Sequence, residues 1–273
     1  MKTILATTDF TQESRAAVNY AARLALINKC ELQILHATYI PVISDAFIDV
    51  TITLEEVEKS DKEKMADLVR HIQSKQGPAL RVKGINEVGL TEELLKEKIT
   101  QPEDTLVVMG VKHVDKFSRA VFGSTATSLA GQIPCPLMII PPEARFRPWK
   151  KLAFSFDNKE IPVKSGINFI KEMVSVYNSK LHFVHVMGID EVTKDSTPIS
   201  TIRDIIGGES HLHFLEGNDD TVATVRDWIR RYKANVVVMV ARKHNIFWRM
   251  FNESRTTEMA FESSVPVLVL PEN

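Results

Sequence analysis

The chain has 273 residues, 44% of them hydrophobic and 25% charged, a composition typical of a soluble globular protein of about two domains. Its formal net charge is −1, so the overall charge gives no indication of binding to nucleic acid or to a membrane surface. Two cysteines, Cys30 and Cys135, are too few for a disulfide framework and are typical of a reducing compartment.

No targeting or membrane-spanning segment is expected. The first residues, MKTILATTDF, are interrupted by Thr7, Thr8 and Asp9 too early for a signal peptide. No apolar run approaches the roughly 20 residues that a spanning helix needs. We therefore expect a cytoplasmic protein without a membrane partner.

Short apolar runs alternate with helical patterns along the chain. TILATTD at 3–9 predicts a strand, and residues 12–29 predict a helix capped by Thr11, with Glu13 in its first turn. Helical patterns recur at 54–72, 91–99 and 124–133. This alternation predicts an α/β fold with a parallel sheet covered by helices on both faces.

The same order of segments occurs twice. TILATTDFT at 3 resembles KLAFSFDNK at 151, which aligns Asp9 with Asp157, and the next strands align His36 with His185. DTLVVMG at 104 resembles NVVVMVA at 235, and CPLMIIPPE at 135 resembles VPVLVLPEN at 265. The second copy is shorter between its second and fourth strands. Proline-rich PPEARFRPWKK at 141 predicts a linker, so we expect two domains, 1–145 and 146–273.

A ligand of an open parallel sheet is expected beyond the carboxyl ends of the strands. In the first copy those ends are Thr7-Thr8-Asp9, His36-Ala37-Thr38 and Met109-Gly110. Asp9 could accept hydrogen bonds from ribose hydroxyls, or it could be a turn or cap residue before the first helix. Gly123, Ser124 and Thr125 open the helix at 124–133, where backbone N–H groups could contact phosphate. An ordinary capped helix would show the same residues.

Gly110, His113, Gly123 and Ser124 follow the spacing of a known nucleotide motif: Gly, two residues, Gly, nine residues, Gly, then Ser or Thr. With this motif and the repeat, the whole chain resembles a tandem universal stress protein. The resemblance implies two tandem open, mostly parallel five-stranded sheets of the Rossmann-like, adenine nucleotide alpha hydrolase type. It also implies ATP binding in the first copy, with Mg²⁺ as a candidate companion ion. The residues assigned to the site are Thr7, Thr8 and Asp9 at the ribose; Ala37 beside the base; Met109 near the base or the ribose; Gly110 and His113 in the motif; and Gly123, Ser124, Thr125 and Ala126 around the phosphates.

His113 departs from the motif, which has glycine there. A side chain at that position costs roughly 1–2 kcal/mol if the backbone needs positive φ. Lys112 and His113 could instead offer positive charge to the phosphates, or the loop could simply face solvent. In the second copy Val240, Lys243 and Glu253 replace Gly110, His113 and Gly123, while Asp157 and Ser254 are retained. A glutamate facing phosphate is repulsive, so we expect a degenerate second site. Phe247 and Trp248 indicate packing against another surface, such as the other copy.

Histidines form the other notable pattern. His211 and His213 alternate on one strand, and His182 is expected on a neighbouring strand. Metal binding would need a third ligand in range, and strand packing is the commoner explanation. His36 and His185 are interpreted as strand-end residues near the crevice rather than catalytic bases.

Two functions from different classes follow. The first is a stress-response regulator that binds ATP in its first copy, with hydrolysis slow or absent. Its two copies would pair through their final strands, lying antiparallel, as a pseudo-dimer within one chain, and a homodimer of chains is also open. The second is a regulatory scaffold that binds no nucleotide and acts on an unknown protein partner through its sheet and dimer surfaces. A true hydrolase is a weaker third reading, because no positioned base and nucleophile can be named.

Overall fold

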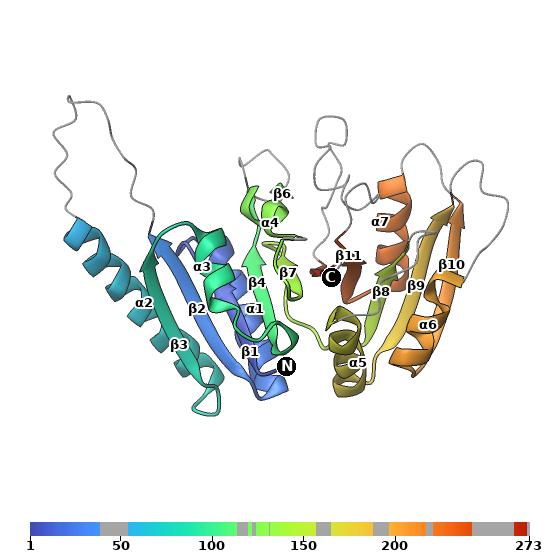
Figure 1. Ribbon diagram of the computed structural model, residues 1–273, viewed down its shortest axis with the longest axis horizontal. Helices are drawn as coiled ribbons and strands as arrows, with labels where there is room; N and C mark the ends of the chain where they lie inside the picture. The colour runs from blue at the N-terminus through green and yellow to red at the C-terminus, as the bar shows by residue number, and fades with distance from the viewer. Residues whose placement is uncertain are drawn as a thin grey trace, which may run out of the picture.

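The computed structural model describes residues 1–38, 54–113, 120–121, 124–130, 132–156, 165–187, 197–216, 221–241 and 265–271. In both halves of the chain, strands and helices alternate (Figure 1). The first half contains β1 (Thr3–Thr7), α1 (Gln12–Asn28), β2 (Glu31–Thr38), α2 (Leu54–Gln76), β3 (Val82–Val88), α3 (Thr91–Lys98), a 3₁₀ turn (Pro102–Asp104), β4 (Thr105–Gly110), β5 (Lys112–His113), β6 (Ala120–Val121), α4 (Ser124–Leu129) and β7 (Leu137–Ile140). The second contains β8 (Lys151–Ser155), α5 (Ser165–Tyr177), β9 (Lys180–Met187), α6 (Thr197–Ile206), β10 (Ser210–Glu216), α7 (Thr221–Tyr232), β11 (Val236–Val240) and β12 (Val267–Leu270).

Five strands from each half join into one ten-stranded sheet, in the order β10-β9-β8-β11-β12-β7-β4-β1-β2-β3. Neighbours within each half are parallel. Between the halves β12 pairs with β7 antiparallel, with Val267 opposite Ile139 and Val269 opposite Leu137. The predicted open, mostly parallel α/β fold is confirmed, and the expected antiparallel contact of the final strands is present. The two predicted sheets form one continuous sheet because β7 and β12 share an edge.

The register of the strands repeats from one half to the other. Thr3 lies opposite Glu31 and Lys151 opposite Lys180, which places His36 and His185 at matching positions. Gly110 lies opposite Ile140 and Val240 opposite Leu270, so Val240 occupies the place of Gly110, as the sequence alignment predicts. The shortening of the second copy falls where expected, because α2 has 23 residues and α6 has 10.

Two apolar cores lie on the two faces of the sheet. One core combines buried residues of α1, α2, α5 and α6 with one set of alternating strand residues, such as Ile4 and Phe154. The other combines α3, α4 and α7 with the opposite set, such as Leu5 and Ala153. Both predicted faces of the sheet are therefore covered by helices. None of the described helices is long and apolar enough to cross a membrane.

The segment predicted as a polar linker contains a core residue, Trp149. Its side chain is fully buried, its Nε1 donates to the Tyr20 hydroxyl at 3.0 Å, and its ring stacks on Tyr177 with centroids 5.7 Å apart. The Ser179 hydroxyl donates to the Trp149 carbonyl. The connection between the halves is thus packed against both of them, and it is not a free spacer.

Candidate functional site

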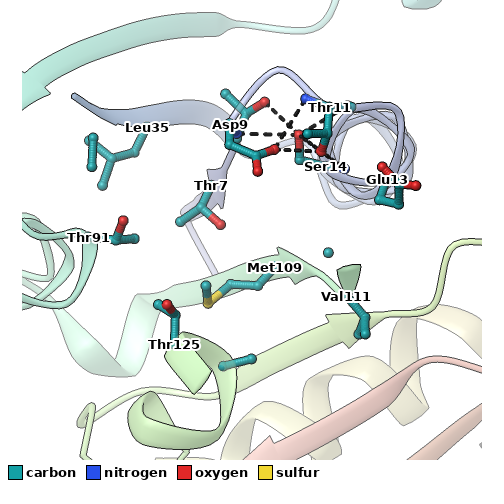
Figure 2. A pocket seen from close by; sticks show the side chains of 14 residues that line it. Thr7, Asp9, Thr11, Glu13, Ser14, Leu35, Thr91, Met109, Val111 and Thr125 are labelled. Atoms are coloured by element: carbon teal, nitrogen blue, oxygen red, sulfur yellow. Dashed lines mark hydrogen bonds between the residues drawn. The ribbon is translucent and has the colours of Figure 1, made fainter. Parts of the chain in front are cut away.

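A cavity of about 260 Å³ lies at the carboxyl end of the first-half strands (Figure 2). The ends of β1, β2 and β4 and the first turn of α4 contribute to its wall. Eight of the residues predicted for the site line it: Thr7, Thr8, Asp9, Ala37, Met109, Gly110, Thr125 and Ala126. Its volume lies just below the ~300–1,000 Å³ of typical small-molecule pockets. It is therefore of a size suited to a small ligand.

The loop between β1 and α1 forms one wall of the cavity. Asp9 Oδ1 accepts hydrogen bonds from the Thr11 backbone N–H at 3.2 Å and from the Thr11 hydroxyl at 2.5 Å. Thr11 in turn caps α1 by accepting from the Ser14 backbone N–H. The turn-and-cap role that the sequence allows for Asp9 is thus present. A carboxylate has about four acceptor positions, so the same side chain can also accept from a ligand in the cavity.

Ser14 ties the loop to the first turn of α1. Its hydroxyl lies 3.0 Å from the Thr8 hydroxyl and accepts from the Asp9 backbone N–H at 3.3 Å. Phe10, which follows Asp9 in the loop, has φ 64°, in the left-handed region that a residue with a side chain seldom adopts. These contacts define the direction of the Asp9 side chain (Figure 2).

The ionisable residues in the described part of the cavity wall are acidic. They are Asp9 and Glu13, and this part of the wall includes no lysine, arginine or histidine. Like charges repel, so this part of the wall suits hydroxyl groups and an uncharged ring better than a polyphosphate. Phosphate groups would need a cation or a contact beyond this wall.

Gly110 is explained by helix packing. A Cβ at this position would lie 3.0 Å from the Glu13 carbonyl oxygen and 3.3 Å from the Ala17 Cβ, both on α1. The absence of a side chain therefore lets α1 approach β4 closely. This glycine would be needed whether or not a ligand binds.

A model of the universal stress protein family matches residues 1–141. The chain belongs to this family. Solved structures agree over the full length: a universal stress protein from Archaeoglobus fulgidus has a TM-score of 0.73 at 17% identity, over 99% of this chain and 98% of that one. One from Pseudomonas aeruginosa has a TM-score of 0.58 at 15% identity, over 99% and 93%. At these identities the structures support the fold alone. No curated protein matches the sequence significantly.

Three site residues predicted from the resemblance to universal stress proteins are only partly placed. His113 lies on β5, where it pairs with Ala120 on β6, and Ser124 is the first residue of α4. The side chains of His113 and Ser124, and the whole of Gly123, lie outside the described residues. So do the second-half residues Asp157, Lys243, Phe247, Trp248, Glu253 and Ser254. The predictions for these residues stay predictions.

Six lining residues of this universal stress protein were not predicted as part of the site: Thr11, Glu13, Ser14, Leu35, Thr91 and Val111. Leu35 is two residues before Ala37 on β2, so the period of a strand places both on one face. Thr91 begins α3 just after β3 ends, which brings it to the same edge of the sheet. The rule that points to strand ends could have found both residues, because it applies equally to β3.

The predicted histidine neighbours do meet in this universal stress protein, at the outer end of the second half. His182 Nδ1 lies 3.0 Å from His213 Nε2, and the His182 and His211 rings stack at 5.0 Å. Trp228 and Tyr232 of α7 pack against them. Among the described residues no group of three or more His, Cys, Asp or Glu side chains is arranged to hold a metal ion. The contacts of these histidines are those of strand packing.

Proposed function

We propose that this protein is a stress-response regulator that binds an adenine nucleotide, ATP, in the cavity of its first half. The observation that carries the proposal is the convergence of the strand ends. Asp9, Ala37, Met109 and Thr125 come from four separate elements and line one cavity. The motif resemblance assigns these same positions to ribose, base and phosphate.

The wall suggests an orientation for the nucleotide. Ala37, Leu35 and Met109 offer an apolar surface for the adenine, and Asp9 offers an acceptor for the ribose hydroxyls. The phosphates would extend towards Thr125 and Ala126 and the preceding Gly123 and Ser124. Because the acidic residues Asp9 and Glu13 line the cavity, Mg²⁺ would reduce repulsion of the phosphates. No positioned base and nucleophile is evident among the described residues, so we expect hydrolysis to be slow or absent.

We further propose that residues 146–273 form a domain with a degenerate site. Val240 occupies the position equivalent to Gly110, the glycine that lets α1 approach β4 in the first half. The sequence alignment places Glu253 at the position expected to contact phosphate. The β7–β12 pair would then act as an internal dimer contact, making the chain a pseudo-dimer of its own two domains. A homodimer of chains would have to use other surfaces.

Calorimetric titration of ATP into nucleotide-free protein tests the proposal. We expect affinity in the ~1–100 µM range at about one site per chain. Asp9→Asn keeps an oxygen that can accept from Thr11 but removes the charge, and should weaken binding roughly tenfold. The matched control is Asp157→Asn in the second half, which should leave the affinity unchanged. Equal affinity of wild type and Asp9→Asn would exclude this cavity as the ATP site.

The negative wall favours a second candidate, a scaffold that binds no nucleotide. The acidic residues Asp9 and Glu13 line the cavity, the described part of its wall includes no lysine, arginine or histidine, and Gly110 is explained by packing alone. In this case the family's nucleotide motif would be a remnant, and the protein would act through protein partners. Absence of heat with ATP, with and without Mg²⁺, in protein verified to be nucleotide-free would support the scaffold.

A further inference from the structure

His36, at the end of β2, contacts the loop that carries Asp9 on two sides. Its Nδ1 lies 2.8 Å from the Thr8 backbone oxygen. Because a carbonyl oxygen can only accept, Nδ1 carries the hydrogen and donates. The imidazole ring packs against the Phe10 ring in a tilted arrangement, with ring centroids 4.4 Å apart and planes inclined by 41°. One side chain from β2 thus holds the residues immediately before and after Asp9.

Asp61 of α2 orients this imidazole. Asp61 Oδ2 lies 3.1 Å from His36 Nε2, and the residue is only 6% exposed. The carboxylate also accepts from the Thr38 hydroxyl at 2.9 Å and from Lys64 Nζ at 3.2 Å. Burial raises the pKa of the Asp61 carboxyl, but these hydrogen bonds and the adjacent His36 outweigh burial and leave the pKa below its ordinary value.

The loop has a conformation that needs support from outside. Phe10 has φ 64°, which is unfavourable for a residue with a side chain. On the helix side, Thr11 and Ser14 bond to Asp9 and Thr8. On the side of β2 and α2, the support comes from His36, and Lys64 Nζ lies over the Phe10 ring, 5.7 Å from its centroid. Movement of His36 would therefore release the loop that directs Asp9 into the cavity.

We propose that His36 is a positioning residue of the nucleotide cavity, holding the Asp9 loop through Thr8 and Phe10, and that Asp61 keeps its ring in the correct orientation. The inference rests on the proposed function for the ligand, while the positioning itself is a property of the unliganded protein. It also links α2 to the cavity, because a shift of Asp61 would be transmitted through one imidazole to Asp9. His36 does not line the cavity, so it acts through the loop and not on the ligand.

The second half supplies a matched control. His185 Nδ1 lies 3.0 Å from the Phe156 backbone oxygen, the same bond at the equivalent register position. Its ring packs against Phe156 and Phe214, at 5.0 and 6.0 Å between centroids. A substitution at His185 therefore disturbs a similar bond in a similar sheet, but in the half where no nucleotide is expected.

Two substitutions distinguish the role of Nδ1 from that of Nε2 in the His36 ring. His36→Asn can place an amide N–H near the position of Nδ1 and keep the bond to Thr8. His36→Gln places its amide near Nε2, where it can reach Asp61 but not Thr8. In calorimetric titrations with ATP, we expect His36→Gln to lose about tenfold in affinity and His36→Asn to lose no more than about threefold. His185→Gln should bind as wild type does.

Amide hydrogen exchange of the unliganded proteins gives a readout that does not depend on ATP. The Phe10 amide donates to the Thr8 hydroxyl at 3.0 Å, and the Thr11 amide donates to Asp9. Both amides should exchange faster in His36→Gln than in wild type and stay close to wild type in His36→Asn. If wild-type protein binds no ATP, the proposed function fails, and this exchange pattern still decides whether His36 positions the loop.

Three outcomes would overturn the inference: wild-type affinity and exchange in His36→Gln, equal losses in the Gln and Asn variants, or an equal loss in His185→Gln. If His36→Gln does not fold, Asp61→Asn replaces it, since it keeps the shape of the side chain and removes the charge that orients the ring. It should weaken ATP binding several-fold and speed exchange at Phe10. An unchanged affinity and exchange rate in Asp61→Asn would count against the inference.

Discussion

Acid should destabilise this protein through the histidine pair of β9 and β10, in which His182 is buried and His213 half-buried. His182 is 7% exposed, and its Nε2 is buried without a hydrogen-bond partner among the described residues. Its Nδ1 shares a 3.0 Å hydrogen bond with His213 Nε2. Protonation of His182 would place a second N–H and a full charge in this apolar site, next to Trp228 and Tyr232.

Burial, followed by the neighbouring His213 and His211, lowers the pKa of His182 to about 4. Burial and His211 also lower the pKa of His213. In the unfolded chain a histidine titrates near 6.5. Between these values the unfolded state binds more protons than the native state, so the free energy of unfolding falls as the pH falls. For His182 alone the loss is about 2 kcal/mol between about pH 7 and about pH 5, and it approaches about 3 kcal/mol near pH 4.

The assay is urea unfolding at a series of pH values from 7 to 5, for wild type and for His182→Gln. Glutamine copies Gln33, which occupies the matching register position in the first half. The variant loses ring packing at every pH, so its absolute stability is not the readout. The readout is the slope of the free energy of unfolding against pH. Between pH 7 and pH 5 this free energy should fall by about 2 kcal/mol more in the wild type than in the variant. Parallel curves for the two proteins would refute the reasoning.

Three further predictions concern packing and burial. Gly110→Ala should lower the free energy of unfolding by about 1–3 kcal/mol, because the new methyl group meets the α1 backbone at 3.0 Å; urea unfolding measures this, and an unchanged midpoint would contradict it. Tyr20→Phe and Trp149→Phe each remove one partner of a buried hydrogen bond and should each cost about 1–3 kcal/mol. The loss of unfolding free energy in the double variant should be smaller than the sum of the two single losses. Strictly additive losses in this double-mutant cycle would mean that the hydrogen bond contributes nothing. Burial raises the pKa of Cys30 to about 11 and that of Cys135 to about 12, so the native protein should resist alkylation near pH 8 and react fully in urea, as measured by mass spectrometry.

The succession of strands along the chain was predictable because the same segments occur in the same order in both copies. Asp9 and Asp157, and His36 and His185, align in sequence, and the strand registers place both histidines at equivalent positions. The replacement of Gly110 by Val240 was also correctly aligned. These strands are buried on both faces and read as continuous apolar runs, so the agreement comes from matching residues at corresponding places in the two copies.

Contacts between distant segments were harder to foresee. Trp149 sits among prolines and basic residues and resembles a linker residue, but its indole fits between Tyr20 and Tyr177 from the two halves. Asp61 lies in a charged helix segment interpreted as a solvated face, but its carboxylate is buried against His36. In each case the burial of the side chain depends on where its helix or segment lies relative to the sheet. The local sequence pattern does not predict that placement.

Glu13 illustrates the same limit at the cavity. Its place in the first turn of α1 is explained by the helix dipole, and nothing in that pattern indicates that it faces a cavity. Glu13 becomes part of the wall because α1 packs closely on β4, where a Cβ at Gly110 would lie 3.0 Å from the Glu13 backbone oxygen. The negative character of the wall is therefore a tertiary property, and it is what makes the nucleotide titration decisive between the two candidate functions.

The pairing of β7 with β12 has a consequence for synthesis of the chain. Residues 137–140 leave the ribosome before residues 267–270 exist, and at ordinary translation rates the interval is on the order of ten seconds. During that interval the folded first half presents an apolar strand edge with no partner of its own. Two chains growing on one messenger RNA could pair these edges, or could later exchange their final strands. The contact that unites the two halves would then also be an edge for which neighbouring nascent chains compete.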